Sequence, residues 1–265
     1  MTDQPSENAA SPPDGPSFRI DWGLQGLLRL IDSYDFRTVL DVGSGGGDHA
    51  RLLRHIGKEV VTVDLHRDAD IRADFMGAVI DGTFDVVWCS HVLEHQRNPG
   101  AFLEKLRRCL APDGVLAISV PTHPPDRMVA GHVSSWNAWL LCYHLVLAGF
   151  DCAEARYVNT VYLSLIVRHR SAQAGDIGMG AGSGADLDPA DGADPFTAIA
   201  PFFPFPVSQG ATAPLSEMNW GGFDYLLPAG FPPFRLHSRF LPRRGCLLAG
   251  EGEPSQSRLL RPRRC

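Results

Sequence analysis

Short apolar runs bounded by glycine, proline or charged residues recur along the first 170 residues. Such runs are typical of strands that are buried on both faces of a sheet. Between them lie stretches whose apolar residues recur at helical spacing. Because strands and helices alternate, we expect a doubly wound α/β fold with a mostly parallel sheet. The predicted strands are 39–42, 59–64 and 114–120, and segments 152–158 and 161–168 form a final antiparallel hairpin.

Residues with capping character mark where two of the helices begin. Asp21 is placed to cap a helix that starts at Trp22. Asn98 combines with Pro99 to give another helix an N-cap and a proline in its first turn. The predicted helices are 22–31, 49–56, 99–110 and 134–147.

The first predicted strand runs directly into glycines. Val39–Val42 is followed by the glycine-rich residues 43–47, which can form a turn tight enough for a ligand to touch bare backbone. Asp64 ends the next strand, at the separation that ribose recognition requires. A dinucleotide-binding fold has a third glycine where this chain has Asp48, whose carboxylate would face the pyrophosphate. These features predict a nucleoside cofactor without a pyrophosphate.

The segment from Asp41 to Gly47 has the pattern D-x-G-x-G-x-G, which resembles motif I of the class I S-adenosylmethionine-dependent methyltransferases. Their cofactor carries a sulfonium and an ammonium in place of phosphates, and acidic surroundings suit these cations. The resemblance extends from residue 38 to residue 168. Within it, residues 84–95 look like strand four and its loop in the branch similar to ubiquinone methyltransferases. It implies a Rossmann-like fold with a seven-stranded sheet and S-adenosylmethionine as cofactor.

The resemblance also implies which residues contact this cofactor. The glycine loop borders the methionine part, a first carboxylate places the ammonium, and a second carboxylate pairs with the ribose hydroxyls. The loop residues are Gly43, Ser44, Gly45 and Gly47, the first carboxylate is Asp41, and the ribose is bordered by Asp64 and Leu65. Asp74 and Phe75 are expected beside the adenine, and Ser90 and His91 near the sulfonium.

Four histidines fall in loops on the side of the sheet where open α/β folds bind ligands: His91, His95, His123 and His132. Histidine is the commonest group that removes a proton near neutral pH, so we expect one of them to act as the base for a hydroxyl acceptor. His132 and His95 are the first candidates. The alternative for each of the four is a structural role as a capping or hydrogen-bonded histidine.

Residues 91–95, His-Val-Leu-Glu-His, also match the H-x-x-E-H signature of inverted zinc peptidases. That site needs its histidines on one long helix and a third ligand further along, whereas this pentad follows a strand and precedes a new helix at Asn98. We therefore expect no metal site. The chain also lacks, after that strand, the Pro-Pro motif with which amino-methylating enzymes hold a base amine. Oxygen is thus the expected acceptor atom, and nitrogen is the alternative.

Composition divides the chain into five segments. Residues 1–17 lack the features of a secretory signal and are expected to be disordered, and residues 18–170 are expected to form the methyltransferase domain. Residues 171–195 contain six glycines and five aspartates without an aromatic residue, which predicts a flexible linker. Aromatic residues then recur among prolines in 196–248, which we expect to form a flap. Residues 249–265 form a basic, disordered tail.

The six cysteines form no C-x-x-C pair, which fits a reducing cytosol, and no apolar run is long enough to span a bilayer. The formal net charge of −6 disfavours a nucleic-acid partner, although eight arginines lie in residues 231–265. We therefore expect a cytoplasmic methyltransferase for a small-molecule or glycan-type acceptor, with its oligomeric state open. The alternatives are a catalytically silent scaffold protein that binds S-adenosylmethionine and an enzyme that uses this cofactor for aminopropyl transfer.

Overall fold

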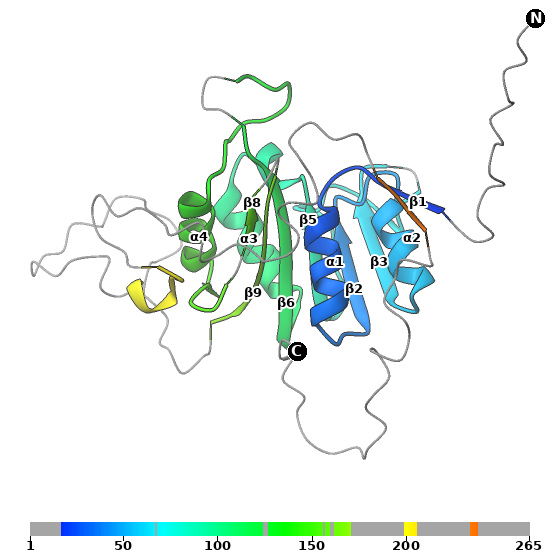
Figure 1. Cartoon of the computed structure of the whole chain (residues 1–265), viewed down its shortest axis with the longest axis horizontal. Coiled ribbons are helices and arrows are strands. Elements are labelled where there is room, and N and C mark those ends of the chain that lie inside the picture. The colour runs from blue at the N-terminus through cyan, green and yellow to red at the C-terminus, as the bar shows by residue number, and fades with distance from the viewer. Residues whose placement is uncertain are drawn as a thin grey trace, which may run out of the picture.

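Helices lie on both sides of one large sheet in the computed structural model (Figure 1). The structure describes residues 17–66, 68–123, 127–155, 157–159, 162–170, 199–205 and 234–237. The predicted linker and basic tail lie outside the described residues, as does all of the predicted N-terminal segment except its last residue.

Among the described residues, the large sheet has the strand order β4-β3-β2-β5-β6-β9-β7, and a short further strand, β8, pairs with β9. The strands from β4 to β6 are parallel to their neighbours, whereas β9 runs antiparallel to β6, β7 and β8. The predicted doubly wound, mostly parallel seven-stranded sheet with an antiparallel C-terminal part is therefore confirmed. The strands are β2 (Thr38–Val42), β3 (Glu59–Asp64), β4 (Ile71–Arg72), β5 (Phe84–Ser90), β6 (Leu110–Pro121), β7 (Phe150–Asp151), β8 (Tyr157–Asn159) and β9 (Tyr162–His169).

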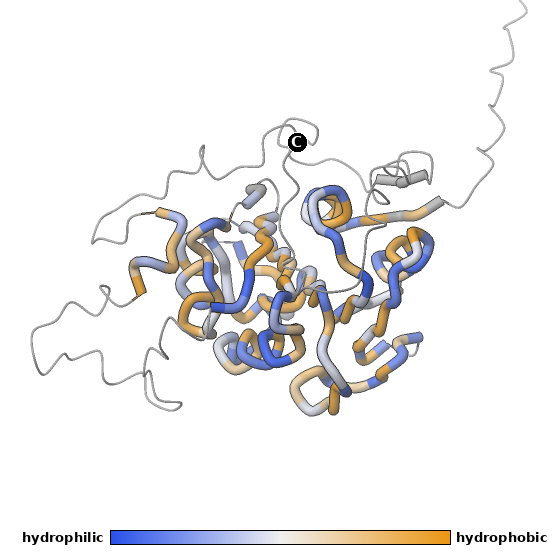
Figure 2. Tube along the Cα trace, turned by 90° about the horizontal axis from the view of Figure 1, so that it is seen from below, coloured by the Kyte–Doolittle hydropathy of each residue, from blue (hydrophilic) through white to orange (hydrophobic). Residues whose placement is uncertain are grey.

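Two apolar layers hold the helices against the sheet, because alternate residues of a strand face opposite sides. Val39 and Val86 pack in the layer under α1 and α2, whereas their neighbours Leu40 and Val87 pack in the layer under α3 and α4. Figure 2 shows hydrophobic and hydrophilic residues alternating around the helical turns, as expected for helices with one buried face. The helices are α1 (Leu24–Ser33), α2 (Asp48–His55), α3 (Pro99–Arg108) and α4 (Ala138–Leu147).

Side-chain capping explains where α3 and α4 begin. α3 starts at Pro99 as predicted, and the Asn98 side chain accepts a hydrogen bond from the Ala101 N–H at 3.1 Å. The predicted start of α4 at Ser134 is wrong. That helix begins at Ala138, because Asn137 is extended and its side chain caps the first turn.

The predicted start of α1 at Trp22 is also wrong. The helix begins at Leu24, and its N-cap is Gly23, which has a left-handed φ of 73° and no side chain to cap with. Asp21 is therefore not the cap. A glycine at this position is required by the turn, since a Cβ there would lie 2.6 Å from Ser90 Oγ.

Residues 199–205, which include the 3-10 turn η3 (Ala200–Phe202), pack against α4. The Phe205 ring stacks on Trp139 with centroids 5.2 Å apart, and Phe203 contacts the same ring at 5.7 Å. The Cys152 N–H donates to the Phe202 carbonyl at 2.9 Å. These residues belong to the predicted flap, most of which lies outside the described residues.

A second, two-stranded sheet joins distant parts of the sequence. β1 (Ser17–Ile20) pairs antiparallel with β10 (Phe234–His237), which also falls in the predicted flap. The four described cysteines are free and buried in the core. None of the helices in the described ranges is long and apolar enough to cross a membrane.

Candidate functional site

The carboxyl ends of the parallel strands meet at one edge of the large sheet, which is where open α/β sheets bind ligands. The glycine loop 43–47 follows β2, and Asp64 ends β3 beside it. Residues 91–95 follow β5, the neighbour of β2 on the other side. The segment that begins at Thr122 leaves β6 at the same edge. Most of the predicted site residues therefore lie in one region.

The glycines of the loop serve two different purposes. Gly43 and Gly45 both have positive φ values, 74° and 52°. A Cβ on Gly43 would lie 2.1 Å from Val92 Cγ2, so this glycine lets the loop after β5 pack on the loop after β2. A Cβ on Gly45 would meet no atom of the described residues within 4 Å. Gly45 therefore leaves open space in which a ligand can approach the backbone.

Two carboxylates lie next to this loop. Asp41 is 1% exposed, and its Oδ2 has no hydrogen-bond partner among the described residues. Burial, reinforced by the nearby negative charge of Asp64, raises the pKa of Asp41 to about 7. Asp64 is half-buried and accepts hydrogen bonds from the Gly45 N–H at 2.9 Å and the His66 N–H at 2.7 Å. The pair favours a ligand that brings a cation or hydrogen-bond donors.

Three residues predicted beside the ribose and adenine differ in exposure. Leu65 and Asp74 are exposed at the surface near Asp64. Phe75 is buried: its ring packs edge-on against Phe102 with centroids 5.4 Å apart, and Lys105 Nζ lies 4.8 Å from its centroid. Phe75 thus contributes mainly to the core.

Strained backbone shapes the end of β5. His91 has a φ of 57°, a left-handed conformation that residues with a Cβ rarely adopt and that costs about 1 kcal/mol or more. Its N–H donates to the Ser119 carbonyl at 2.8 Å. Its ring lies near those of Trp22 and Tyr162, with centroids 5.3 and 5.9 Å away. Within the described part of the chain, Ser90 Oγ beside it is buried without a hydrogen-bond partner. With this backbone conformation, His91 Nδ1 lies 3.4 Å from Glu94 Oε1.

The segment before α1 covers this end of β5. His49 Nε2 donates to the Trp22 carbonyl at 2.9 Å, while His49 Nδ1 accepts a hydrogen bond from Trp88 Nε1 at 2.9 Å. Burial lowers the pKa of His49 to about 4, so the ring is neutral at pH 7 and both hydrogen bonds are kept. The adjacent Gly23 lies directly against Ser90.

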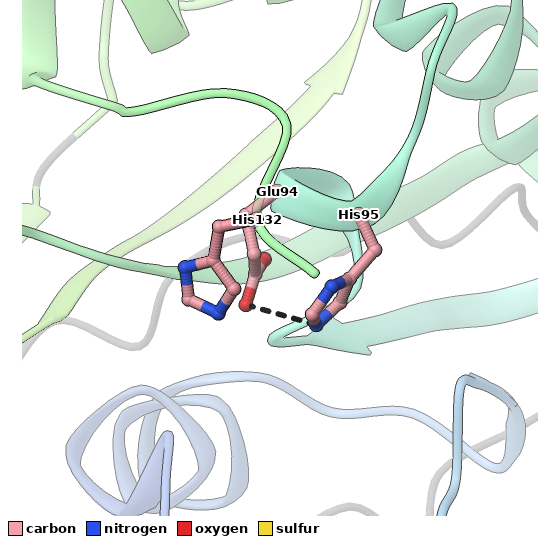
Figure 3. Close-up of side chains that lie close together, drawn as sticks. All are labelled: Glu94, His95 and His132. Carbon is pink, nitrogen blue, oxygen red and sulfur yellow. Dashed lines mark ion pairs between the residues drawn. The ribbon is translucent and has the colours of Figure 1, made fainter. Parts of the chain in front are cut away.

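A buried glutamate lies among the loop histidines. Glu94 belongs to the short 3-10 helix η1, which is one turn long (Leu93–His95), and its side chain is 1% exposed. Oε1 lies 3.4 Å from His91 Nδ1 and 3.9 Å from His95 Nε2, and neither carboxylate oxygen has a hydrogen-bond partner among the described residues. Figure 3 shows the Glu94 carboxylate between the rings of His95 and His132.

His132 reaches this glutamate from a loop that lies far along the chain. The Val133 N–H donates to the Glu94 carbonyl at 2.8 Å, which fixes the loop against η1. The loop also orients His95, because its Nδ1 lies 2.8 Å from the Gly131 carbonyl. A carbonyl only accepts, so Nδ1 carries a proton, and in the neutral form of the ring the lone pair is on Nε2. The rings of His95 and His132 meet edge to face with centroids 4.9 Å apart.

His123, which follows β6, lies beside His132, with ring centroids 5.2 Å apart. Burial lowers the pKa of His132. The nearby Glu94 opposes this effect, and the neighbouring histidines add to it. His132 Nδ1 is buried, and none of the residues that the structure describes forms a hydrogen bond with it. We call Glu94 with these four histidines, His91, His95, His123 and His132, the histidine cluster.

A family model described as a methyltransferase domain matches residues 19–149, which contain the glycine loop, both carboxylates and the whole histidine cluster. Residues 19–149 therefore form a domain of the class I S-adenosylmethionine-dependent methyltransferase family. Its cofactor is therefore S-adenosylmethionine.

Relatives of this chain differ in the acceptor that their names state. A ubiquinone biosynthesis O-methyltransferase of Paraburkholderia xenovorans is 32% identical over 96 residues, which are 29% of this chain and 41% of that protein. A tRNA U34 carboxymethyltransferase of Pseudoalteromonas atlantica is 29% identical over 147 residues, which are 47% of this chain and 46% of that protein. The chain thus spans less than half the length of these curated relatives.

A solved structure with a similar fold is that of 1,6-didemethyltoxoflavin-N1-methyltransferase of Burkholderia thailandensis, with bound 1,6-didemethyltoxoflavin and S-adenosylhomocysteine. The match has a TM-score of 0.46 and 22% identity, and it covers 52% of this chain and 72% of that chain.

The crevice fits the family's cofactor. Among the described residues, no donor reaches the buried Asp41 Oδ2, and an ammonium group would supply one. The space over Gly45 is open for a ligand to lie on the backbone. The acidic pair of Asp41 and Asp64 suits a cationic ligand better than a phosphate.

Three residues of this site, Trp22, His49 and Glu94, are not predicted as site residues from the sequence. Trp22 and His49 cover the end of β5, and neither belongs to a sequence motif that indicates this role. Glu94 enters the sequence analysis only within the zinc-peptidase pattern. The structure shows a single 3-10 turn at 93–95 in place of the long helix which that pattern requires. The sequence signal for this residue is an acidic side chain with a histidine three positions before it and another one position after it. Its burial could not be predicted from the sequence.

Proposed function

We propose that this protein transfers a methyl group from S-adenosylmethionine to an oxygen atom of a small-molecule acceptor. One observation carries the proposal: the cofactor crevice and the histidine cluster are in contact. Val92 packs on Gly43, and Glu94 and His95 follow Val92 within the same short loop. A group held by the cluster therefore lies next to a cofactor held by the glycine loop.

The cofactor contacts follow from the positions of the residues around the crevice. Hydrogen-bond acceptors meet the donors of the cofactor, and bare backbone borders its chain. In this proposal the methionine part lies along the backbone of Gly43, Ser44, Gly45 and Gly47, and Asp41 binds its ammonium. Asp64 and Leu65 border the ribose, and Asp74 and the backbone of Phe75 border the adenine. Ser90 and His91 lie near the sulfonium.

Methyl transfer is an in-line displacement that leaves little covalent chemistry to the protein. A lone pair of the acceptor oxygen forms the new C–O bond, the C–S bond breaks, and its electron pair stays on sulfur. The hydroxyl proton must go to a base. Burial lowers the pKa of His132, which favours its neutral form, and the neutral ring of His95 has its lone pair on Nε2, so we assign this step to His132 or His95. Glu94 stabilises the imidazolium that forms.

The acceptor class is proposed from the chemistry of the cluster. A histidine base serves a hydroxyl group, and both a small metabolite and a glycan-type acceptor present one. The acidic body of the chain disfavours a nucleic acid, although one relative is named for its action on tRNA. A cytoplasmic location fits cysteines that are free and buried. The proposal needs only one chain, and a homo-oligomer is compatible with it.

The test is to incubate the full chain with S-adenosylmethionine and fractionated metabolites and to analyse the products by mass spectrometry. We expect a gain of about 14 Da on a hydroxyl-bearing compound, which Asp64→Ala abolishes. Fragmentation that places the methyl group on nitrogen would correct the acceptor atom. Cofactor binding without a product in any fraction would overturn the proposal in favour of a silent scaffold, and an aminopropyl gain would replace the reaction. Transfer to RNA, with binding that weakens steeply with salt, would replace the acceptor class.

A further inference from the structure

We propose that Glu94, His95 and His132 form a binding site for a divalent transition-metal ion beside the cofactor crevice. One carboxylate oxygen and one nitrogen from each imidazole all lie within 4.8 Å of one another. Figure 3 shows the three side chains pointing toward a common centre from two separate segments, η1 and the loop before α4.

The distances between these three ligand atoms are close to the distances between ligand atoms around a bound metal ion. Metal–ligand bonds of about 2.1 Å place two ligands on opposite sides of an ion about 4.2 Å apart. The side chain of His95 is 44% exposed, which leaves it room for a small adjustment about its hydrogen bond to Gly131, whereas the Glu94 side chain is enclosed. A small rotation of His95 therefore closes the set around an ion without repacking the core.

The state of Glu94 indicates that a positive charge belongs at this position. A buried carboxylate without hydrogen bonds costs several kcal/mol. Its distances to His91 Nδ1 and His95 Nε2, 3.4 and 3.9 Å, are too long for hydrogen bonds. Both of its oxygens are left without partners among the described residues. A metal ion bound to one of these oxygens would remove this cost.

The two histidines are prepared as ligands. The Gly131 carbonyl accepts the Nδ1–H of His95, which directs the Nε2 lone pair toward Glu94. Hydrogen bonding of the second ring nitrogen to a carbonyl is the usual support of a metal-bound histidine. His132 contributes one ring nitrogen to the same set, and an imidazole nitrogen that carries no proton has a lone pair for a metal ion.

The donor set selects the class of ion. Two imidazoles and one carboxylate suit zinc, iron(II), manganese or cobalt, whereas magnesium and calcium prefer oxygen ligands only. Three protein ligands leave open positions for an acceptor. On this basis, and resting on the proposed function, the acceptor would carry two neighbouring oxygen atoms that bind the ion together. The ion would lower the pKa of the hydroxyl, so its proton leaves to solvent and the histidines serve as ligands in place of a base.

The metal site is tested with cobalt(II), because its visible absorption reports the ligand geometry. The full chain is titrated with Co²⁺ at pH 7.5 without cofactor. We expect saturation near one equivalent and displacement by Zn²⁺. Glu94→Gln and His132→Ala should each weaken binding about 100-fold. His55→Ala, which removes a histidine outside the cluster, should bind like the wild type. Unfolding curves establish that each variant is folded.

Two outcomes would overturn the inference: no saturable cobalt binding by the wild type, or binding that Glu94→Gln and His132→Ala leave unchanged. Calorimetry of S-adenosylmethionine with the metal-free chain separates this failure from failure of the proposed function. If the cofactor binds and cobalt does not, the metal site is wrong and methyl transfer with a histidine base stands. If cobalt binds at these residues and the cofactor does not, the metal site stands and the methyl-transfer role is wrong.

Discussion

The cofactor crevice and the histidine cluster share one edge of the sheet, but they are built in different ways. The crevice consists of one short motif, residues 41–47, and Asp64 at the end of the adjacent strand. The histidine cluster brings Glu94 and His95 together with His132, which comes from beyond β6. A ligand site made by one motif can be recognised in a sequence, whereas a site assembled from two distant loops becomes visible only after folding.

The two regions also differ in how their buried acids are compensated. Asp41 has a raised pKa and is able to stay protonated until a cation arrives. Glu94 is surrounded by imidazole rings, and its closest ring nitrogen is 3.4 Å away. The first region is thus suited to a ligand with a permanent positive charge. The second is suited to a proton or a metal ion.

The largest expected effect is on the contact that joins the two regions. Gly43→Ala places a Cβ 2.1 Å from Val92 Cγ2 at a φ of 74°, so we expect the free energy of unfolding to fall by about 3 kcal/mol. Gly45→Ala is the matched control, because its Cβ meets nothing within 4 Å. It should cost about 1 kcal/mol from backbone strain alone. Urea unfolding measures both, and equal losses would contradict the packing role of Gly43.

A substitution of Glu94 should impair the histidine cluster and leave the cofactor crevice unaffected. Glu94→Gln keeps the shape but removes the buried charge, so methyl transfer to the acceptor should fall about 100-fold. Stability should stay the same or rise, because an uncompensated buried charge is lost. Affinity for S-adenosylmethionine should not change. Rates with labelled cofactor, thermal unfolding and calorimetry measure the three quantities. Loss of cofactor affinity in this variant would show that the regions do not act separately.

A smaller effect is expected from the titration of Asp41. Its folded pKa of about 7 lies above the ordinary aspartate value of 3.8, so this group stabilises the fold most at low pH, and the contribution is lost as the pH rises through 7. The ammonium of the cofactor favours the carboxylate. Affinity for S-adenosylmethionine should therefore increase about tenfold from pH 6 to pH 8.

Asp41→Asn should remove both pH dependences. The difference in unfolding free energy between wild type and variant should decrease as the pH rises from 4 to 7. His49, with its pKa lowered to about 4, gives the opposite trend, stabilising the fold as the pH rises, and it cancels in this difference. A variant whose cofactor affinity still rises with pH would exclude Asp41 as the group that titrates.

The sequence allowed the sheet and the crevice to be predicted because local chemistry determines them. Apolar runs define the central strands, glycines define the turn, and Asn98 caps α3 through its own side chain. The start of α1 was not predictable in the same way, because Gly23 is required by contact with Ser90 from a different strand. The burial of Phe75 under Lys105 and the approach of His132 to Glu94 likewise depend on tertiary packing.

The central claim is that Asp64 and the glycine loop bind an adenosyl cofactor, and calorimetry with S-adenosylmethionine tests it most directly. The account predicts single-site binding by the wild type, binding by Asp64→Ala that is about 100-fold weaker, and unchanged binding by Asp81→Ala, which removes an exposed carboxylate elsewhere. No heat with the wild type, or equal affinity in Asp64→Ala, would contradict it.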